Sequence, residues 1–254
     1  MQSGGIPDAR LFGDTLLRSR AGKPVVPQTI IESDGKAVVL DLSHESDLLK
    51  GRPADSGVDW LTERIHQIMA GSGTRFAYGR YAEPRALYDN EHFAGDALGS
   101  AERRTVHMGI DVFCAAGTVI RTPRDGVVHL VTNNDRELDY GPMLVLCHDI
   151  SDGKYFYTLY GHLSLTSIAS TEAGQQVAAG ELVAAVGRPP ENGNWPPHLH
   201  FQLILDLLDL GADFPGVCRA SEQDHWLALS PSPALFFPEI APERLDYRGG
   251  RTVR

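Results

Sequence analysis

The segment HLHFQLIL, residues 198–205, alternates polar and large apolar side chains. In an extended strand, residues i and i+2 lie on the same face of the sheet. The alternation therefore predicts a strand with one polar face, which carries His198, His200 and Gln202, and one apolar face that points into a core. Two imidazoles on the same strand face, one residue apart, indicate a site that uses both.

A second segment, TVHMGIDVFC at residues 105–114, alternates in the same way. As a strand it would place His107, Gly109 and Asp111 on one face and apolar side chains on the other. Gly109 would leave space between the imidazole and the carboxylate, as a bound ion requires. This segment therefore adds one histidine and one carboxylate to the candidate site.

A third histidine-bearing segment is YFYTLYGHLS, residues 155–164. The face that carries Phe156, Thr158 and Tyr160 would also carry His162 if the strand extends that far. Three predicted β segments thus each present histidine on a polar face.

This set of side chains suits zinc. The ion binds imidazole nitrogen and carboxylate oxygen, and a catalytic site uses three protein ligands with one position open. The candidate groups exceed three, and they are His107, Asp111, His162, His198 and His200. Two histidines would then be left to transfer protons or to stabilise developing charge. An i,i+2 pair cannot easily give both rings to one ion, which favours one ligand and one catalytic group.

Three motifs in order, HMGID at 107–111, YGHLS at 160–164 and PHLHF at 197–201, resemble those of the lysostaphin/LytM-type zinc metallopeptidases. The resemblance covers roughly residues 105–205. It implies a small antiparallel β fold that cleaves peptide bonds, mostly those of bacterial cell walls. It also implies roles for single residues, with His107, Asp111 and His200 as zinc ligands, and with His162 and His198 as the catalytic pair.

A wider resemblance covers roughly residues 35–245 and includes GRYAEPRALY at 79–88 and NGNWPPHLHF at 192–201. These stretches are similar to the peptidase-like domain of composite proteins. There the domain lies between an aminoglycoside-phosphotransferase-like kinase and a class III, pyridoxal-phosphate aminotransferase, so this resemblance implies fused kinase and aminotransferase domains. Where wall-cutting relatives approach their HxH motif through glycines, this chain has Trp195, which is expected to line or narrow the groove.

The sequence divides into three predicted parts: a helical lead at 1–73, a zinc metallopeptidase-like β domain at 74–240, and a tail or linker at 241–254. The expected fold class is mainly β, an antiparallel sheet or barrel-like sandwich of the lysostaphin/LytM type with a helical N-terminal lead. Within the lead, SGVDWLTERIHQIMAGSG predicts a helix that Ser56 caps and Gly71 ends. Its apolar face would carry Leu61, Ile65, Ile68 and Met69.

Composition and charge weigh against some functions. The chain has 254 residues and a formal net charge of -10, which disfavours binding to a nucleic acid backbone. No apolar run approaches the roughly 18 residues of a membrane span. The first residues lack the order of a signal peptide, and three cysteines suit reduced thiols, so a cytoplasmic location is expected.

Two classes of function remain open. The first is a zinc-dependent endopeptidase or amide hydrolase that acts on a peptide or a small amide. The second is a catalytically weak or inactive module, serving as a metal-binding or scaffold domain within a larger kinase/aminotransferase protein. A carrier barrel is a weaker alternative. Its hairpin would be GQQVAAGELVAAVG at 174–187, which lacks the lysine that a carrier needs at the turn.

Overall fold

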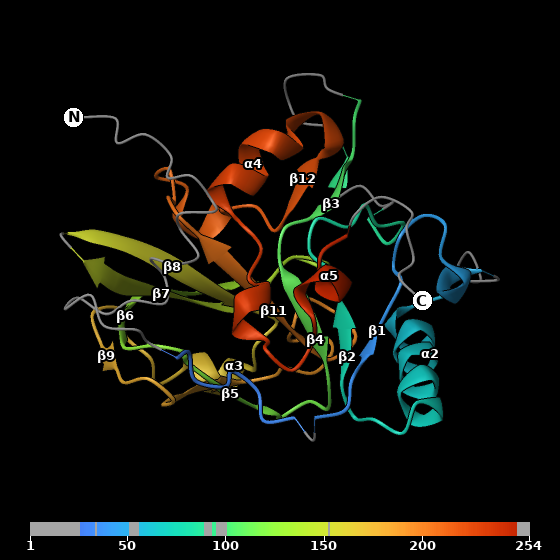
Figure 1. The fold of residues 1–254 in the computed structure, drawn as a ribbon, viewed down its shortest axis with the longest axis horizontal. Helices are drawn as coiled ribbons and strands as arrows, with labels where there is room; N and C mark the ends of the chain where they lie inside the picture. Colours follow the sequence, from blue (N-terminus) through green and yellow to red (C-terminus); the bar gives the residue numbers. More distant parts are fainter. Residues whose placement is uncertain are drawn as a thin grey trace.

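The computed structural model describes residues 26–33, 35–50, 56–88, 93–94, 101–151 and 153–247, and strands dominate this part of the chain (Figure 1). The strands are β1 (Val38–Val39), β2 (Ala77–Gly79), β3 (Arg104–His107), β4 (Ile110–Phe113), β5 (Val119–Arg121), β6 (Gly126–Asn134), β7 (Gly141–Ser151), β8 (Lys154–Gly161), β9 (Gln176–Val177), β10 (Leu182–Ala185), β11 (His198–Ile204) and β12 (Val217–Arg219). The helices are α2 (Val58–Gly71), α3 (Leu165–Ile168), α4 (Gln223–Leu229) and α5 (Pro242–Leu245).

The main sheet has eight strands in the order β1-β2-β4-β11-β8-β7-β6-β9. Its neighbouring strands are antiparallel except for β1 and β2, which run parallel. Two smaller antiparallel sheets pair β5 with β10 and β3 with β12. The predicted mainly β fold is confirmed, and the large sheet is mixed because of its single parallel pair.

Strand β11 lies inside the sheet between β4 and β8, and all seven of its residues are buried. Leu199, Phe201 and Leu203 belong to the main hydrophobic core. Phe201 is paired with Tyr160 of β8, and the two rings pack edge to face with centroids 5.3 Å apart. The predicted alternation is therefore confirmed, with the leucines and phenylalanine in the core and His198, His200 and Gln202 on the other face.

Helix α2 packs beside β1 and β2, at one edge of the sheet (Figure 1). Three of the four predicted apolar positions are buried and Ile68 is partly exposed. The predicted cap at Ser56 is wrong. The helix begins one residue later than predicted, at Val58. Its N-cap is Gly57, which has no side chain to accept a hydrogen bond from the first turn.

The ends of the described chain also contact the β domain. Strand β1, from the predicted lead, extends the main sheet, and Leu245 of α5 is buried in the main core. The domain boundaries after residues 73 and 240 stay predictions, and residues 248–254 of the predicted tail lie outside the described residues.

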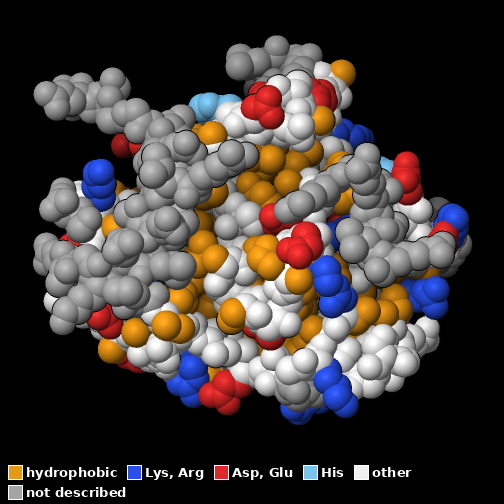
Figure 2. Space-filling model, in the orientation of Figure 1, with side chains coloured by type: hydrophobic (Ala, Val, Ile, Leu, Met, Phe, Trp, Pro, Cys, Tyr) orange, Lys and Arg blue, Asp and Glu red, His pale blue; other side chains and the backbone are white. Residues whose placement is uncertain are grey.

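None of the helices described combines the length and the apolar character needed to cross a bilayer. On the face drawn in Figure 2, Lys and Arg side chains are scattered among Asp and Glu side chains rather than gathered in one patch.

A buried histidine in the sheet gives a pH-dependent stability. The Nδ1–H of His148 donates to the carbonyl of Asp125 (2.9 Å), and the Thr158 hydroxyl lies 2.7 Å from Nε2. Burial lowers the pKa of His148 to about 4. In the unfolded chain the ordinary pKa of about 6.5 returns, so below that pH the unfolded state binds the extra proton.

We therefore expect His148 to lower the free energy of unfolding by about 3 kcal/mol in total as the pH falls from about 6.5 to 4. Above that window both states are neutral at this residue and it contributes no pH dependence. Urea unfolding of wild type and His148→Gln at several pH values measures the difference. Parallel pH profiles for the two proteins would contradict the expectation.

Candidate metal centre and active site

Three residues from three strands meet on the polar face of the sheet: His107 at the end of β3, Asp111 in β4 and His200 in β11. His107 Nε2 lies 3.0 Å from His200 Nδ1, and each of these nitrogens lies 3.1 Å from Asp111 Oδ1. All three residues are buried. The register of the sheet sets this arrangement, because His200 is paired directly with Asp111.

The hydrogen bonds around the two rings define their protonation. His107 Nδ1 lies 3.0 Å from the carbonyl of Arg80, which can only accept, so Nδ1 carries the proton and Nε2 is bare. His200 Nε2 lies 3.0 Å from Gln202 Oε1. The amide nitrogen of Gln202 donates to the Pro215 carbonyl (3.2 Å), which fixes Oε1 as the acceptor. His200 Nε2 therefore carries the proton, and Nδ1 is bare.

Two bare ring nitrogens and a carboxylate oxygen thus face one another with no proton among them. Such a triangle of acceptors needs a cation to offset its repulsion. In a tetrahedral zinc site with bonds of about 2.0–2.1 Å, neighbouring ligand atoms lie about 3.3–3.4 Å apart. The observed separations of 3.0–3.1 Å are close to that value, so the donor set fits zinc. Metal-bound histidines usually donate their other N–H to such acceptors.

The pKa values in this cluster favour the metal-binding forms. Burial, with the nearby Arg85, lowers the pKa of His107 to about 4, so the ring is neutral at pH 7. Burial alone would raise the pKa of Asp111, but nearby positive charge, of which the paired Arg85 guanidinium is a permanent source, holds the pKa well below its usual value. Asp111 is therefore a carboxylate, as a ligand must be.

The predicted strand through HMGID is interrupted. His107 ends β3, which pairs with β12, whereas Asp111 belongs to β4, which pairs with β2 and β11. Single-strand alternation was therefore the wrong reason for their proximity, because the two residues sit in different sheets. The space expected at Gly109 is present. A Cβ there would lie 2.6 Å from His200 Cε1 and 2.8 Å from the carbonyl oxygen of Phe201.

Gly109→Ala is accordingly expected to displace the His200 ring, because the Phe201 backbone in β11 cannot move away. We expect zinc affinity to fall about 10–100-fold, the range for changes that disturb ligand orientation. Competition with a chromophoric chelator measures this, with Gly57→Ala, where the added Cβ meets no atom within 4 Å, as the matched control. Equal affinities in the two variants would refute this role for Gly109.

His162 reaches the same site by a different route from the one predicted. Strand β8 ends at Gly161, which is paired with His200, so a continued strand would turn residue 162 toward the core with Tyr160. Instead His162 has φ of 62°, a left-handed conformation that is costly for a residue with a Cβ. This backbone reversal places the imidazole beside His198, with ring centroids 4.3 Å apart.

His198 and His162 each have one bare nitrogen as well. The Nδ1–H of His198 donates to the Pro196 carbonyl (2.7 Å), and the Nδ1–H of His162 donates to the Asn192 carbonyl (2.9 Å). The bare Nε2 of His198 lies 3.8 Å from Asp111 Oδ1, farther than the three clustered atoms lie from one another. Burial lowers the pKa of both rings, so both are neutral bases at pH 7.

A cavity of about 290 Å³ opens over these five side chains. Trp195 lines it, as the sequence suggested, and further walls come from aromatic and apolar residues of several segments of the chain. These wall residues include Leu87, Tyr88, Phe93, Leu138 and Phe214. All five predicted site residues are thus brought together around one cavity.

Sequence reasoning missed two residues beside the cluster. Arg85 forms an ion pair with Asp111, and Tyr140 has its ring centroid 5.4 Å from that of His200. Arg85 belongs to a run in which Tyr81, Glu83 and Arg85 are buried and the residues between them are less so. The sequence signal for such a run is normally an alternation of apolar and polar side chains. Here two of the buried positions carry charged residues, so the run does not alternate in hydropathy.

Comparison with known proteins gives a family match over part of the chain. Residues 105–207 match the sequence model of Peptidase family M23. The L-Ala--D-Glu endopeptidase of Bacillus subtilis is 29% identical over 136 residues, which are 50% of this chain and 39% of that protein. The DD-carboxypeptidase/endopeptidase Mpg of Neisseria meningitidis is 34% identical over 101 residues, which are 40% of this chain and 20% of that protein. The chain thus spans less than half the length of these curated relatives.

Among solved structures, the catalytic domain of lysostaphin from Staphylococcus simulans superposes with a TM-score of 0.35 at 22% identity, over 46% of this chain and 77% of that one. A zinc containing peptidase from Vibrio cholerae superposes with a TM-score of 0.30 at 24% identity, over 45% of this chain and 34% of that one. The family match runs from the second residue of β3 to beyond the end of β11 and includes all five clustered side chains. Over residues 105–207, about two fifths of the chain, the protein is therefore similar to Peptidase family M23.

Proposed function

We propose that this chain is a zinc-dependent hydrolase that cleaves peptide bonds or small amides, with His107, Asp111 and His200 as the zinc ligands. The observation that carries the proposal is the triangle of three bare acceptor atoms at 3.0–3.1 Å. The family match and relatives named as endopeptidases support the choice of reaction.

When bound, zinc would supply Lewis acidity, polarising the scissile carbonyl and lowering the pKa of a water molecule toward about 7. The chain's own contribution is to supply two bases beside that position. His198 and His162 each present a bare Nε2, because a backbone carbonyl holds the proton on Nδ1. Either ring can accept the proton that water loses as its oxygen attacks the carbonyl carbon.

The same two rings account for the second half of the reaction. After one ring has taken the water proton, it is an imidazolium that can donate to the leaving amine nitrogen as the C–N bond breaks. While it holds that proton, the imidazolium can also stabilise the negative charge that develops on the carbonyl oxygen, and the other ring lies beside it with centroids 4.3 Å apart. Water is consumed, one proton reaches the amine, and both imidazoles return to their neutral state.

The cavity supports a substrate of limited size around the scissile bond. Its volume of about 290 Å³ and its wall of Trp195, Tyr88 and Phe93 suit a short peptide segment or a small amide with an apolar group. The resemblance to composite proteins, with fused kinase and aminotransferase domains, supports a small amide made inside the cell. This context is part of the proposal.

The proposal is tested by metal analysis of protein purified without added zinc, together with a hydrolysis screen over peptides and small amides. We expect one zinc per chain and turnover of at least one substrate. A strong chelator should abolish the turnover and zinc should restore it, with lower thermal stability in the metal-free protein. Protein without zinc would refute the proposal. Bound zinc without turnover across the screen would favour the metal-binding or scaffold module instead.

A further inference from the structure

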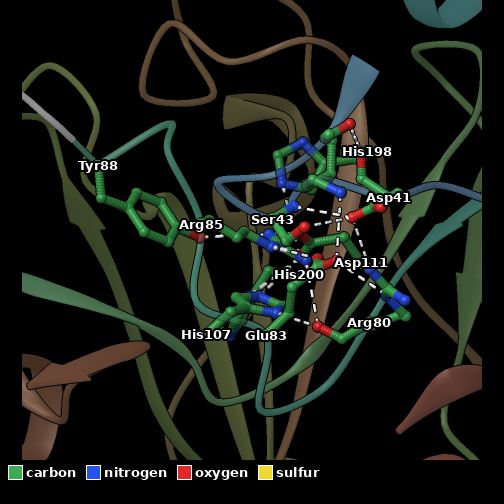
Figure 3. A network of polar contacts seen from close by, with 12 residues as sticks. Asp41, Ser43, Arg80, Glu83, Arg85, Tyr88, His107, Asp111, His198 and His200 are labelled. Atoms are coloured by element: carbon green, nitrogen blue, oxygen red, sulfur yellow. Dashed lines mark hydrogen bonds and ion pairs between the residues drawn. The ribbon is translucent and has the colours of Figure 1, made fainter. Parts of the chain in front are cut away.

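A buried arginine from outside the matched family segment contacts the candidate metal centre. Arg85 is only 2% exposed, and Figure 3 shows it between Tyr88 and Asp111. Its Nη1 lies 2.5 Å from Asp111 Oδ2 and 3.2 Å from the Tyr88 hydroxyl. A guanidinium is expensive to bury, so this placement indicates a strong interaction with the groups around it.

The two oxygens of the Asp111 carboxylate have different partners. Oδ1 faces His107 Nε2 and His200 Nδ1, both at 3.1 Å, whereas Oδ2 accepts from Arg85. An oxygen engaged by a guanidinium at 2.5 Å is not free to turn toward an ion. The arginine therefore limits Asp111 to one ligand oxygen.

Glu83 holds the guanidinium from its other side. The Nε of Arg85 lies 3.1 Å from Glu83 Oε2, and Glu83 is fully buried. Glu83 Oε1 accepts from the backbone N–H of Leu42 (3.1 Å) and from Arg80 Nη2 (2.5 Å). Both ends of Arg85 are thus fixed by carboxylates, and its charge is balanced within the protein (Figure 3).

The backbone of this segment is tied to the first ligand strand. Arg85 N–H donates to the Thr105 carbonyl (2.9 Å), and His107 N–H donates to the Glu83 carbonyl (3.0 Å). The carbonyl of Arg80 accepts from Nδ1 of His107. Gly79 leaves room for the arginine, since a Cβ there would lie 2.6 Å from Arg85 Nη2. Residues 79–85 therefore orient two of the three candidate ligands.

We propose that Arg85 is a positioning residue of the metal centre, which holds Asp111 as a one-oxygen ligand and so keeps a coordination position open. This inference rests on the proposed zinc site. Without Arg85 the carboxylate can rotate and offer both oxygens to the ion, which would occupy the position needed by water or substrate. Arg85 acts through Asp111, the candidate ligand that it contacts.

The first test compares zinc affinity in Arg85→Gln, Arg85→Lys and wild type by chelator competition. We expect Arg85→Gln to bind zinc about 10–100-fold more weakly, the range for residues that orient a ligand. Arg85→Lys should recover part of the loss, because lysine keeps the charge but lacks the fork that joins Asp111 to Glu83. Arg124→Gln is the matched control. That arginine is also buried, but it lies by Phe156 and the Asp149 carbonyl, away from the site.

The second test replaces zinc with cobalt and records the visible spectrum, which reports coordination number. The wild type should give the intense bands of a four-coordinate ion, and Arg85→Gln the weaker bands of higher coordination. The spectrum of the wild-type protein tests the proposal even if a variant fails to fold, because weak bands in the wild type would mean a higher coordination number and would overturn the proposal. Wild-type zinc affinity in a folded Arg85→Gln, verified by near-ultraviolet circular dichroism, would overturn it too. Neither zinc affinity nor the cobalt spectrum depends on hydrolysis. A protein that binds zinc without turnover would therefore refute the proposed hydrolase function but not the proposed role of Arg85.

Discussion

Replacing His198 with alanine is expected to leave zinc bound and to reduce hydrolysis by about 10²–10⁴-fold, the usual contribution of a positioned acid–base group. His198 Nε2 lies 3.8 Å from Asp111 Oδ1, outside the tight triangle formed by the ligand atoms. Its Nδ1–H is held by Pro196, so Nε2 is presented as a base. The measurement is kcat on the substrate found in the screen, with zinc content determined on the same sample.

His162→Ala should behave in the same way, because its Nε2 is bare for the same reason. His225→Ala, at an exposed histidine on α4, is the matched control and should keep both zinc and activity. Loss of zinc from His198→Ala with zinc retained in His200→Ala would mean that the two roles are exchanged. Unchanged rates in both His198→Ala and His162→Ala would place the chemistry elsewhere.

The second large effect concerns the ligands themselves. His200→Ala removes one of the three clustered donors and leaves Asp111 and His107 facing a gap. We expect zinc affinity to fall by more than the roughly 10–100-fold that indirect changes cost, and hydrolysis to fall with it. The measurement is zinc occupancy after dialysis against a mild chelator, followed by the rate. A His200→Ala protein with full occupancy would refute the ligand assignment.

The part of the site that lies on one strand could be predicted from sequence. Strand β11 pairs with a neighbour on each side and so stays extended. The alternation of side chains in an extended strand is then enough to place His198 and His200 on the face opposite the core residues. The chemistry of the donors then pointed to a metal, and the order of three motifs pointed to the family.

Alternation failed where the backbone departs from an extended strand. His162 joins the site because its φ of 62° turns its side chain to the opposite face from the one that a continued strand would give. No residue in YGHLS predicts this left-handed conformation. His107 and Asp111 meet across two sheets rather than along one strand. The role of Arg85 depends on segments far apart in the chain, with Glu83 and Asp111 both buried against it, and such contacts cannot be read from local spacing.

The most direct test of the metal centre is a crystal structure of the zinc-loaded protein, with anomalous data collected at the zinc absorption edge. We expect one strong peak per chain, about 2.0–2.2 Å from His107 Nε2, Asp111 Oδ1 and His200 Nδ1, with no bond to His162 or His198. A peak held by His162 or His198 in place of one of the three, or no peak in this cavity, would contradict the assignment.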